Sequence, residues 1–168
     1  LHILHSLGFD SPGAGLVNKA QSAAYHTNTY AVSTDGGLVI AETITPNPRT
    51  VTVSGGTVYT GAIPQIVNDF DSSTDQMTEV KHSSPGVWAY ANVLVYDNTL
   101  IDDGTGVTSY IGNSKYGVRW FYRSIGDVKQ VFYVYGSVGA HNSVEAAALE
   151  LPRTDLPLVI QHHCKLVG

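Results

Sequence analysis

The sequence predicts a mainly β fold, an antiparallel β-sandwich or barrel-like domain with one short helix near its C-terminal end. Charged residues make up 14% of the 168 residues, well below the roughly 25% of an ordinary soluble domain. Runs rich in Val, Thr and Tyr, which favour strands, recur along the chain. Clusters of Gly, Asn and Asp separate these runs, and such clusters are typical of the turns between strands.

Composition also limits the partners that we expect. The net charge is −5 and the nine Lys and Arg residues are scattered, so no basic face for nucleic acid or an anionic membrane is predicted. No apolar run approaches the roughly 20 residues of a membrane span. A single cysteine, Cys164, excludes an intrachain disulfide framework.

The chain divides by composition into an irregular N-terminal segment, residues 1–29, and a β-rich module, residues 30–168. The first segment is rich in Gly and Ala and begins without Met or the basic region of a signal peptide. The final apolar run stops abruptly at Leu166-Val167-Gly168. We therefore expect the sequence to be a piece of a longer chain.

Two hairpins are predicted in the first part of the module. Asp35-Gly36-Gly37 separates two β runs within residues 30–44, and Gly55-Gly56 separates two more within residues 46–61. The proline-flanked stretch 45–48 is expected to be a connector, because proline cannot occupy a central strand. In the more polar region that follows, Val67 and Phe70 are the expected buried anchors, and the composition of residues 71–76 predicts a turn.

The clearest strand patterns follow. Residues 87–97 form a long run of aromatic and β-branched residues, and residues 101–106 predict a turn. Residues 116–136 predict a hairpin of two aromatic strands joined through Ile125-Gly126-Asp127.

One helix is expected at about residues 143–150. Asn142 is the expected N-cap, Glu145 the residue that returns the capping bond, and Pro152 the residue that stops the helix. Residues 156–168 are interpreted as a last strand.

Residues 50 to 168 resemble a module of phage and environmental-virus structural proteins of the tail-fibre or appendage kind. The resemblance lies in the order of several short motifs, at residues 54–59, 102–106, 113–122, 134–136, 143–148, 156–159 and 165–168. They read SGGTVY, DDGTG, NSKYGVRWFY, VYG, SVEAAA, LPLV and KLVG.

The resemblance implies a virion structural protein in an extracellular particle, with no enzymatic activity and no cofactor. It implies assembly with itself, a trimer being favoured, assembly with other virion proteins, and contact with host surface glycans through its loops. Strand edges are then paired or covered by oligomer contacts. The alternative function is a carbohydrate-binding module.

Aromatic side chains supply the candidate binding residues. An exposed aromatic face could stack on sugar rings, whereas a buried one would form the core or a subunit contact. Alternation places Trp120 and Tyr122 opposite Phe121, and Tyr133 and Tyr135 opposite Phe132. The candidate platform consists of Trp88, Tyr90, Trp120, Tyr122, Tyr133 and Tyr135.

Other candidate sites have weaker patterns. On the predicted last strand only His162 and Cys164 share a face, so a zinc site would need further ligands from His2, His5, His26, His82 or His141. A Cys164 nucleophile lacks the usual turn or helix N-terminus. The oxygen-rich set Asp97, Asn98, Asp102 and Asp103 could hold calcium, but its spacing is that of ordinary turns. No glycine-rich segment has the lysine of a phosphate loop.

Overall fold

The computed structural model describes most of the β-rich module, and its contacts divide the chain into two units. The described residues are 38–43, 49–60, 63–106, 108–126, 129–137 and 139–168. Unit 2, the larger, comprises Ile40–Val53, Phe70–Ser124 and Gln130–Gly168. The described part of unit 1 comprises residues 38–39, 54–60, 63–69, 125–126 and 129. The predicted segment 1–29 lies outside the described residues, and so does most of the predicted hairpin within residues 30–44.

Unit 1 contains an antiparallel hairpin of β3 (Gly56–Thr60) and β4 (Ile63–Val67). Gly55 precedes β3 at a point where a Cβ atom would lie 2.7 Å from the Val67 carbonyl oxygen, so only glycine fits. The hairpin predicted across Gly55-Gly56 is wrong, because the run after these glycines pairs with the next strand rather than with the preceding one. Val67 is buried, as predicted.

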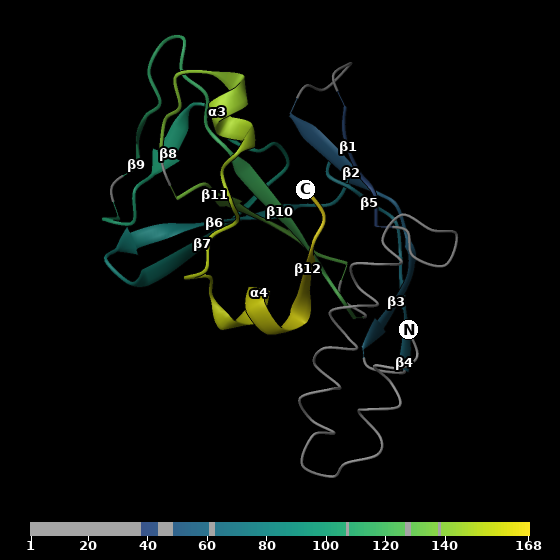
Figure 1. Cartoon of the computed structure of the whole chain (residues 1–168). Helices are drawn as coiled ribbons and strands as arrows, with labels where there is room; N and C mark the ends of the chain where they lie inside the picture. The colour runs from purple at the N-terminus through teal and green to yellow at the C-terminus, as the bar shows by residue number, and fades with distance from the viewer. Residues whose placement is uncertain (1–37, 44–48, 61–62, 107, 127–128, 138) are drawn as a thin grey trace. The chain divides into compact units, whose positions relative to one another are not determined.

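Unit 2 is built on a five-stranded sheet with the strand order β12-β10-β11-β6-β7 (Figure 1). Its strands are β6 (Met77–Ser84), β7 (Val87–Val93), β10 (Arg119–Ser124), β11 (Val131–Tyr135) and β12 (Cys164–Leu166). Neighbouring strands are antiparallel except β11 and β6, which are parallel. The hairpin predicted for residues 116–136 is confirmed as the β10–β11 pair.

Two smaller sheets complete unit 2. A three-stranded sheet has the order β1-β2-β5, and β8 pairs with β9. Their strands are β1 (Ile40–Thr43), β2 (Thr50–Val53), β5 (Phe70–Asp71), β8 (Leu100–Asp102) and β9 (Thr108–Tyr110). Phe70 is buried and residues 72–74 form a turn, both as predicted. The mainly β fold with a helix near the C-terminal end is confirmed.

Alternation separates two faces of the five-stranded sheet, which we call face A and face B. Face A carries the hydrophobic cluster Val80, Tyr122, Phe132, Val134 and Ile160, flanked by Trp88, Trp120, Leu156 and Cys164. Face B carries Glu79, Phe121, Tyr133 and Tyr135. The predicted opposition of Trp120 and Tyr122 to Phe121, and of Tyr133 and Tyr135 to Phe132, is therefore confirmed.

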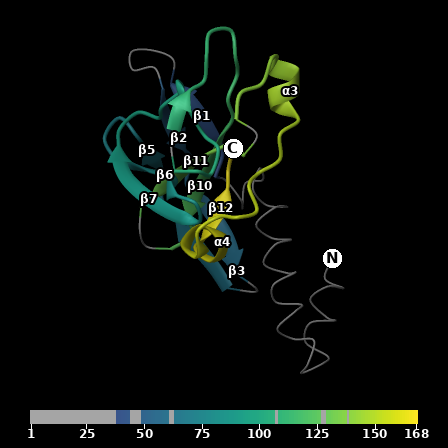
Figure 2. The same cartoon turned by 90° about the vertical axis from the view of Figure 1, so that its left-hand side faces the viewer.

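Helix α4 (Leu158–His163) occupies a segment that was predicted to be a strand. Only Cys164–Leu166, directly after α4, is extended. Both views show α4 beside β12 (Figures 1 and 2). Helical spacing turns Ile160 onto face A at 1% exposure while Leu158 stays 69% exposed. The overlooked signal is Pro157, which stands at the N-cap and is compatible with a helix start.

Helix α3 (Val144–Ala148) confirms the predicted helix but not its cap. The N-cap is Ser143, whose side-chain oxygen accepts a hydrogen bond from the Ala146 N–H at 3.1 Å. Asn142, the predicted cap, instead accepts a hydrogen bond from the Lys115 ammonium group. The helix ends at Ala148, four residues before Pro152.

The burial of α4 yields a test of the corrected segment. We expect Ile160→Ala to lower the free energy of unfolding by about 2–5 kcal/mol, because it leaves a cavity against face A. Leu158→Ala should change it by less than about 0.5 kcal/mol. Urea unfolding of both variants measures the difference. Equal losses would contradict the helix, since residues two apart on a strand share a face.

Candidate functional site

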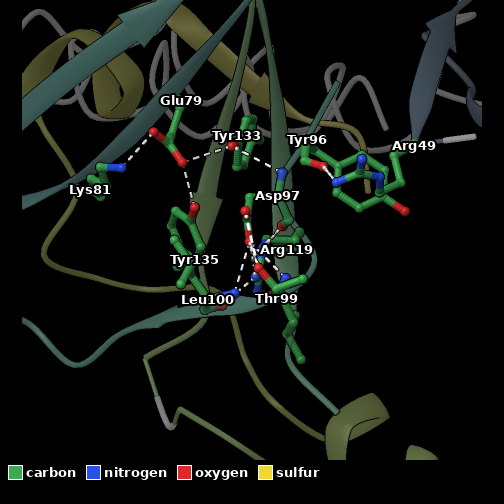
Figure 3. A network of polar contacts seen from close by, with 11 residues as sticks. Arg49, Glu79, Lys81, Tyr96, Asp97, Thr99, Leu100, Arg119, Tyr133 and Tyr135 are labelled. Carbon is green, nitrogen blue, oxygen red and sulfur yellow. Dashed lines mark hydrogen bonds and ion pairs between the residues drawn. The ribbon is translucent and has the colours of Figure 1, made fainter. Parts of the chain in front are cut away.

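Glu79 of β6 places a buried carboxylate on face B. Its Oε1 atom accepts hydrogen bonds from the hydroxyl groups of Tyr133, at 2.9 Å, and of Tyr135 (Figure 3). The ammonium group of Lys81 lies 2.8 Å from its Oε2 atom. Glu79 and Tyr133 stand side by side in the parallel β6–β11 register. The tyrosine hydroxyls therefore tie the two parallel strands together through one carboxylate.

Asp97 and Arg119 close these contacts into a ring. The Tyr133 hydroxyl accepts a hydrogen bond from the Asp97 N–H at 3.2 Å, and the Asp97 carbonyl accepts one from Arg119 Nε at 2.7 Å (Figure 3). The Arg119 guanidinium carbon lies 4.2 Å from the centre of the Tyr135 ring, whose hydroxyl donates to Glu79. We call Glu79, Tyr133, Asp97, Arg119 and Tyr135 the polar ring.

The guanidinium group of Arg119 holds the backbone around the polar ring. Besides the Asp97 carbonyl, it donates to the carbonyl oxygens of Val118, at 2.9 Å, and Leu100. The Asp97 carboxylate accepts hydrogen bonds from the N–H groups of Thr99, at 2.7 Å, and Leu100, at 2.8 Å. The hydrogen bonds of the Arg119 guanidinium group and of the Asp97 carboxylate thus hold the backbone between β7 and β8 in place.

Tyr96 connects the three-stranded sheet to the polar ring. Its hydroxyl donates to Glu42 of β1 at 2.5 Å, and its N–H donates to the Arg49 carbonyl at 3.1 Å. Its ring meets the Phe121 ring edge-on, with 5.6 Å between centroids. Arg49, just before β2, has a φ of +68°, a left-handed conformation that side-chain-bearing residues rarely adopt. The backbone bond to Tyr96 helps to hold that conformation.

Burial and hydrogen bonding set the protonation states around the polar ring. Burial raises the pKa of Glu79, but the hydrogen bonds from Lys81, Tyr135 and Tyr133 outweigh it and leave this pKa below its ordinary value. Burial raises the pKa of Tyr133 and of Tyr135, and their bonds to Glu79 raise it further. Near neutral pH the site therefore holds an ionised carboxylate, which accepts hydrogen bonds, and two neutral tyrosine hydroxyls, which donate them. This arrangement is suited to holding neighbouring strands together.

Cys164 is held as a thiol. Burial raises its pKa to about 12, whereas a cysteine nucleophile needs a lowered pKa. His162 and His163 lie at the end of α4 and are exposed. The predicted strand face shared by His162 and Cys164 does not exist, because the histidine is helical. Among the described residues, His, Cys, Asp and Glu form no group of three that could hold a metal ion.

His82 forms a second polar cluster, at the end of β6. Asp102 Oδ2 accepts hydrogen bonds from the His82 N–H at 2.9 Å and lies 3.0 Å from its Nδ1. The other ring nitrogen, Nε2, lies 4.0 Å from the Asp155 carboxylate. Each nitrogen thus faces a carboxylate rather than a hydroxyl or thiol that it could activate. Trp88 packs on the ring with 3.8 Å between centroids.

Arg153 fastens this cluster from the C-terminal part of the chain. It pairs with both oxygens of Asp155, at 2.9 and 2.8 Å, and donates to the Asp102 carbonyl at 3.3 Å.

The aspartates of the predicted oxygen-rich set bond the backbone of turns. Asp97 caps Thr99 and Leu100, Asp102 accepts from the Gly104 N–H, and Asp103 accepts from the Thr105 N–H.

The six predicted platform residues do not form one exposed surface. Tyr133 and Tyr135 lie on face B and are buried, and Tyr122 on face A is 5% exposed. Trp88 and Trp120 on face A are half-buried, and of the six Tyr90 alone is exposed. The prediction of a six-residue platform is wrong, because strand alternation divides the set between two faces and packing covers most of it.

The polar ring was missed in the sequence. Glu79 and Lys81 occur two apart in a strand, a spacing that does place them on one face, but their partners come from strands far along the chain. Comparison of the chain with protein families, with curated proteins and with solved structures found no match. The site is therefore interpreted from its own geometry.

The Glu79 carboxylate predicts a defined acid dependence. Because its pKa is lower in the folded protein, its stabilising contribution is fully present above about pH 4.5 and is lost as the pH falls through the folded-state value. We expect the midpoint of thermal unfolding to fall less steeply between about pH 5 and pH 3 in Glu79→Gln than in the unsubstituted protein. Parallel profiles would show that this carboxylate does not contribute.

Arg119→Lys tests the guanidinium group. A lysine cannot reach three carbonyl oxygens in fixed directions, so we expect a loss of about 1–3 kcal/mol in the free energy of unfolding. Arg49→Lys is the matched control, since the side-chain hydrogen bond from Arg49 to the Tyr96 carbonyl is long, at 3.4 Å. Urea unfolding of the two variants gives the comparison. A loss for Arg49→Lys as large as that for Arg119→Lys would contradict the assignment.

Proposed function

We propose that this chain is a structural module of a virus particle, of the tail-fibre, baseplate or appendage kind, that acts through subunit assembly and not through catalysis. The order of motifs from residue 54 to residue 168 supports the viral class. The polar ring and the His82 cluster support a mechanical role, because their charged groups bond to backbone and to one another.

The observation that carries the proposal is the exposure of large apolar side chains on a surface with few charges. Unit 2 exposes Val87, Tyr90, Leu94 and Val95 along β7 and the residues after it, and Val144, Leu149, Leu151, Leu158 and Val159 near the helices. Leu149 and Leu151 are 80% and 78% exposed and border a hollow of about 550 Å³. Large exposed apolar surfaces mark sites of protein–protein contact.

Assembly of this kind explains the composition as well. With 14% charged residues and a net charge of −5, the chain has little charge to keep copies apart. In this proposal the apolar side chains contact further copies, three being expected from the resemblance, and other virion proteins. The module then acts in the extracellular particle. Among the described residues, no helix is long and apolar enough to cross a membrane.

Glycan binding is the second candidate function, and the observations favour it less. Stacking of a sugar ring needs an open aromatic face, and Tyr90, 52% exposed, is the open member of the predicted platform. In this second reading Tyr90 would contribute to a host-glycan contact. A glycan array with the isolated chain and with Tyr90→Ala separates this reading from assembly.

Solution mass tests the proposed function. We expect light scattering over a range of protein concentrations to show a stable homo-oligomer, because burial of the exposed apolar side chains favours association. A mass equal to one chain at every concentration would contradict assembly through this module. Glycan binding by that monomer would then favour the second candidate.

A further inference from the structure

Strand β7 presents a long edge of the five-stranded sheet. In the part of the chain that the structure describes, β7 pairs on one side with β6 and is the last strand in the sheet order. It spans seven residues, whereas β12 at the other end spans three. The outer N–H and C=O groups of such an edge are a template for another strand.

β7 lacks the features that usually prevent edge pairing. No charged residue occurs between Lys81 and Asp97, and β7 contains no proline. The register shift of the β6–β7 pair lies at His82 and Ser84, near the turn, so the paired positions from Met77 to His82 are regular. Natural sheets protect exposed edges with charges, prolines or bulges. An edge of this length that no other described strand covers can pair with a further strand.

We propose that the outer edge of β7, which no other described strand covers, pairs antiparallel with β7 of a second copy of this chain. The register centred on Tyr90 places Tyr90 opposite Tyr90 and Val87 opposite Val93, and it pairs all seven residues. Val87 and Tyr90, at 53% and 52% exposure, are then covered by apolar neighbours.

The uncharged composition of β7 is compatible with a second copy as the partner. Contact through β7 brings no like charges together, because the run from Val87 to Tyr96 contains none. The β7 strand of a second copy has the same length and the same uncharged composition, whereas β12 has only three residues.

This inference rests on the proposed self-assembly but departs from the three copies that the resemblance implies. A β7–β7 contact has two-fold symmetry, so it requires an even number of copies. The viral resemblance by itself implies three. Stoichiometry therefore separates the two statements.

The test compares lysine substitutions of one tyrosine and one valine whose side chains are similarly exposed. Tyr90→Lys places like charges opposite each other in the proposed pair and should weaken self-association at least tenfold in light scattering. Val144→Lys on α3 adds the same charge at a side chain of 56% exposure and should leave self-association unchanged. Circular dichroism and thermal unfolding establish that both variants are folded.

A cysteine cross-link tests the register. In a Cys164→Ser background, Tyr90→Cys should form a covalent dimer under mild oxidation, and Val144→Cys should not. A trimer that Tyr90→Lys leaves intact would overturn the β7 contact while leaving the proposed assembly in place. A monomer at all concentrations would overturn both. An even-numbered assembly that dissociates with Tyr90→Lys and cross-links through residue 90 supports the β7 contact.

Discussion

The arrangement of unit 2 depends on the bonds made by one buried carboxylate, that of Glu79. A carboxylate in this position is unfavourable unless its oxygens are bonded, because burial costs an unpaired charge several kcal/mol. Tyr133, Tyr135 and Lys81 supply those bonds. The two tyrosines belong to β11, the parallel neighbour of β6. The need to satisfy Glu79 therefore selects the register in which these two strands lie together.

The polar ring extends this constraint to the loops. Tyr133 bonds the Asp97 backbone, and Arg119 bonds the carbonyls on either side of the Asp97 turn. Tyr96, next in the chain, reaches Glu42 on β1. A single set of contacts thereby links the five-stranded sheet, the connection from β7 to β8 and the three-stranded sheet. These contacts are consistent with the proposed role in an extracellular particle, and the β7 edge for which we propose a second copy as partner takes no part in them.

Local patterns in the sequence predicted the parts of the fold that depend on neighbouring residues. The aromatic hairpin, its two faces and the helix after Asn142 follow from alternation, turn residues and alanine content. The hairpin at Gly55-Gly56 and the last strand failed for a different reason. Two glycines between β runs do not say which run pairs with which, and Pro157 followed by Leu158 is compatible with either a strand or a helix start.

The candidate site could not be predicted from the sequence, because its members meet only in the folded chain. Glu79 and Tyr135 are 56 positions apart, and Tyr96 and Glu42 are 54 apart. A parallel β6–β11 pair has no local signature, since its strands are not joined by a tight turn. The aromatic platform failed for a related reason. The sequence identifies the aromatic side chains, but only packing in the folded chain decides that Tyr122, Tyr133 and Tyr135 are buried.

A double-mutant cycle between Glu79 and Tyr135 tests the central claim most directly. The free energy of unfolding would be measured by urea denaturation for Glu79→Gln, Tyr135→Phe and the double variant at neutral pH. If the carboxylate organises β6 and β11, the two substitutions should be coupled by roughly 0.5–3 kcal/mol, with the double variant less destabilised than the sum of the single ones. Additive losses would show that the two side chains act independently and would contradict the account.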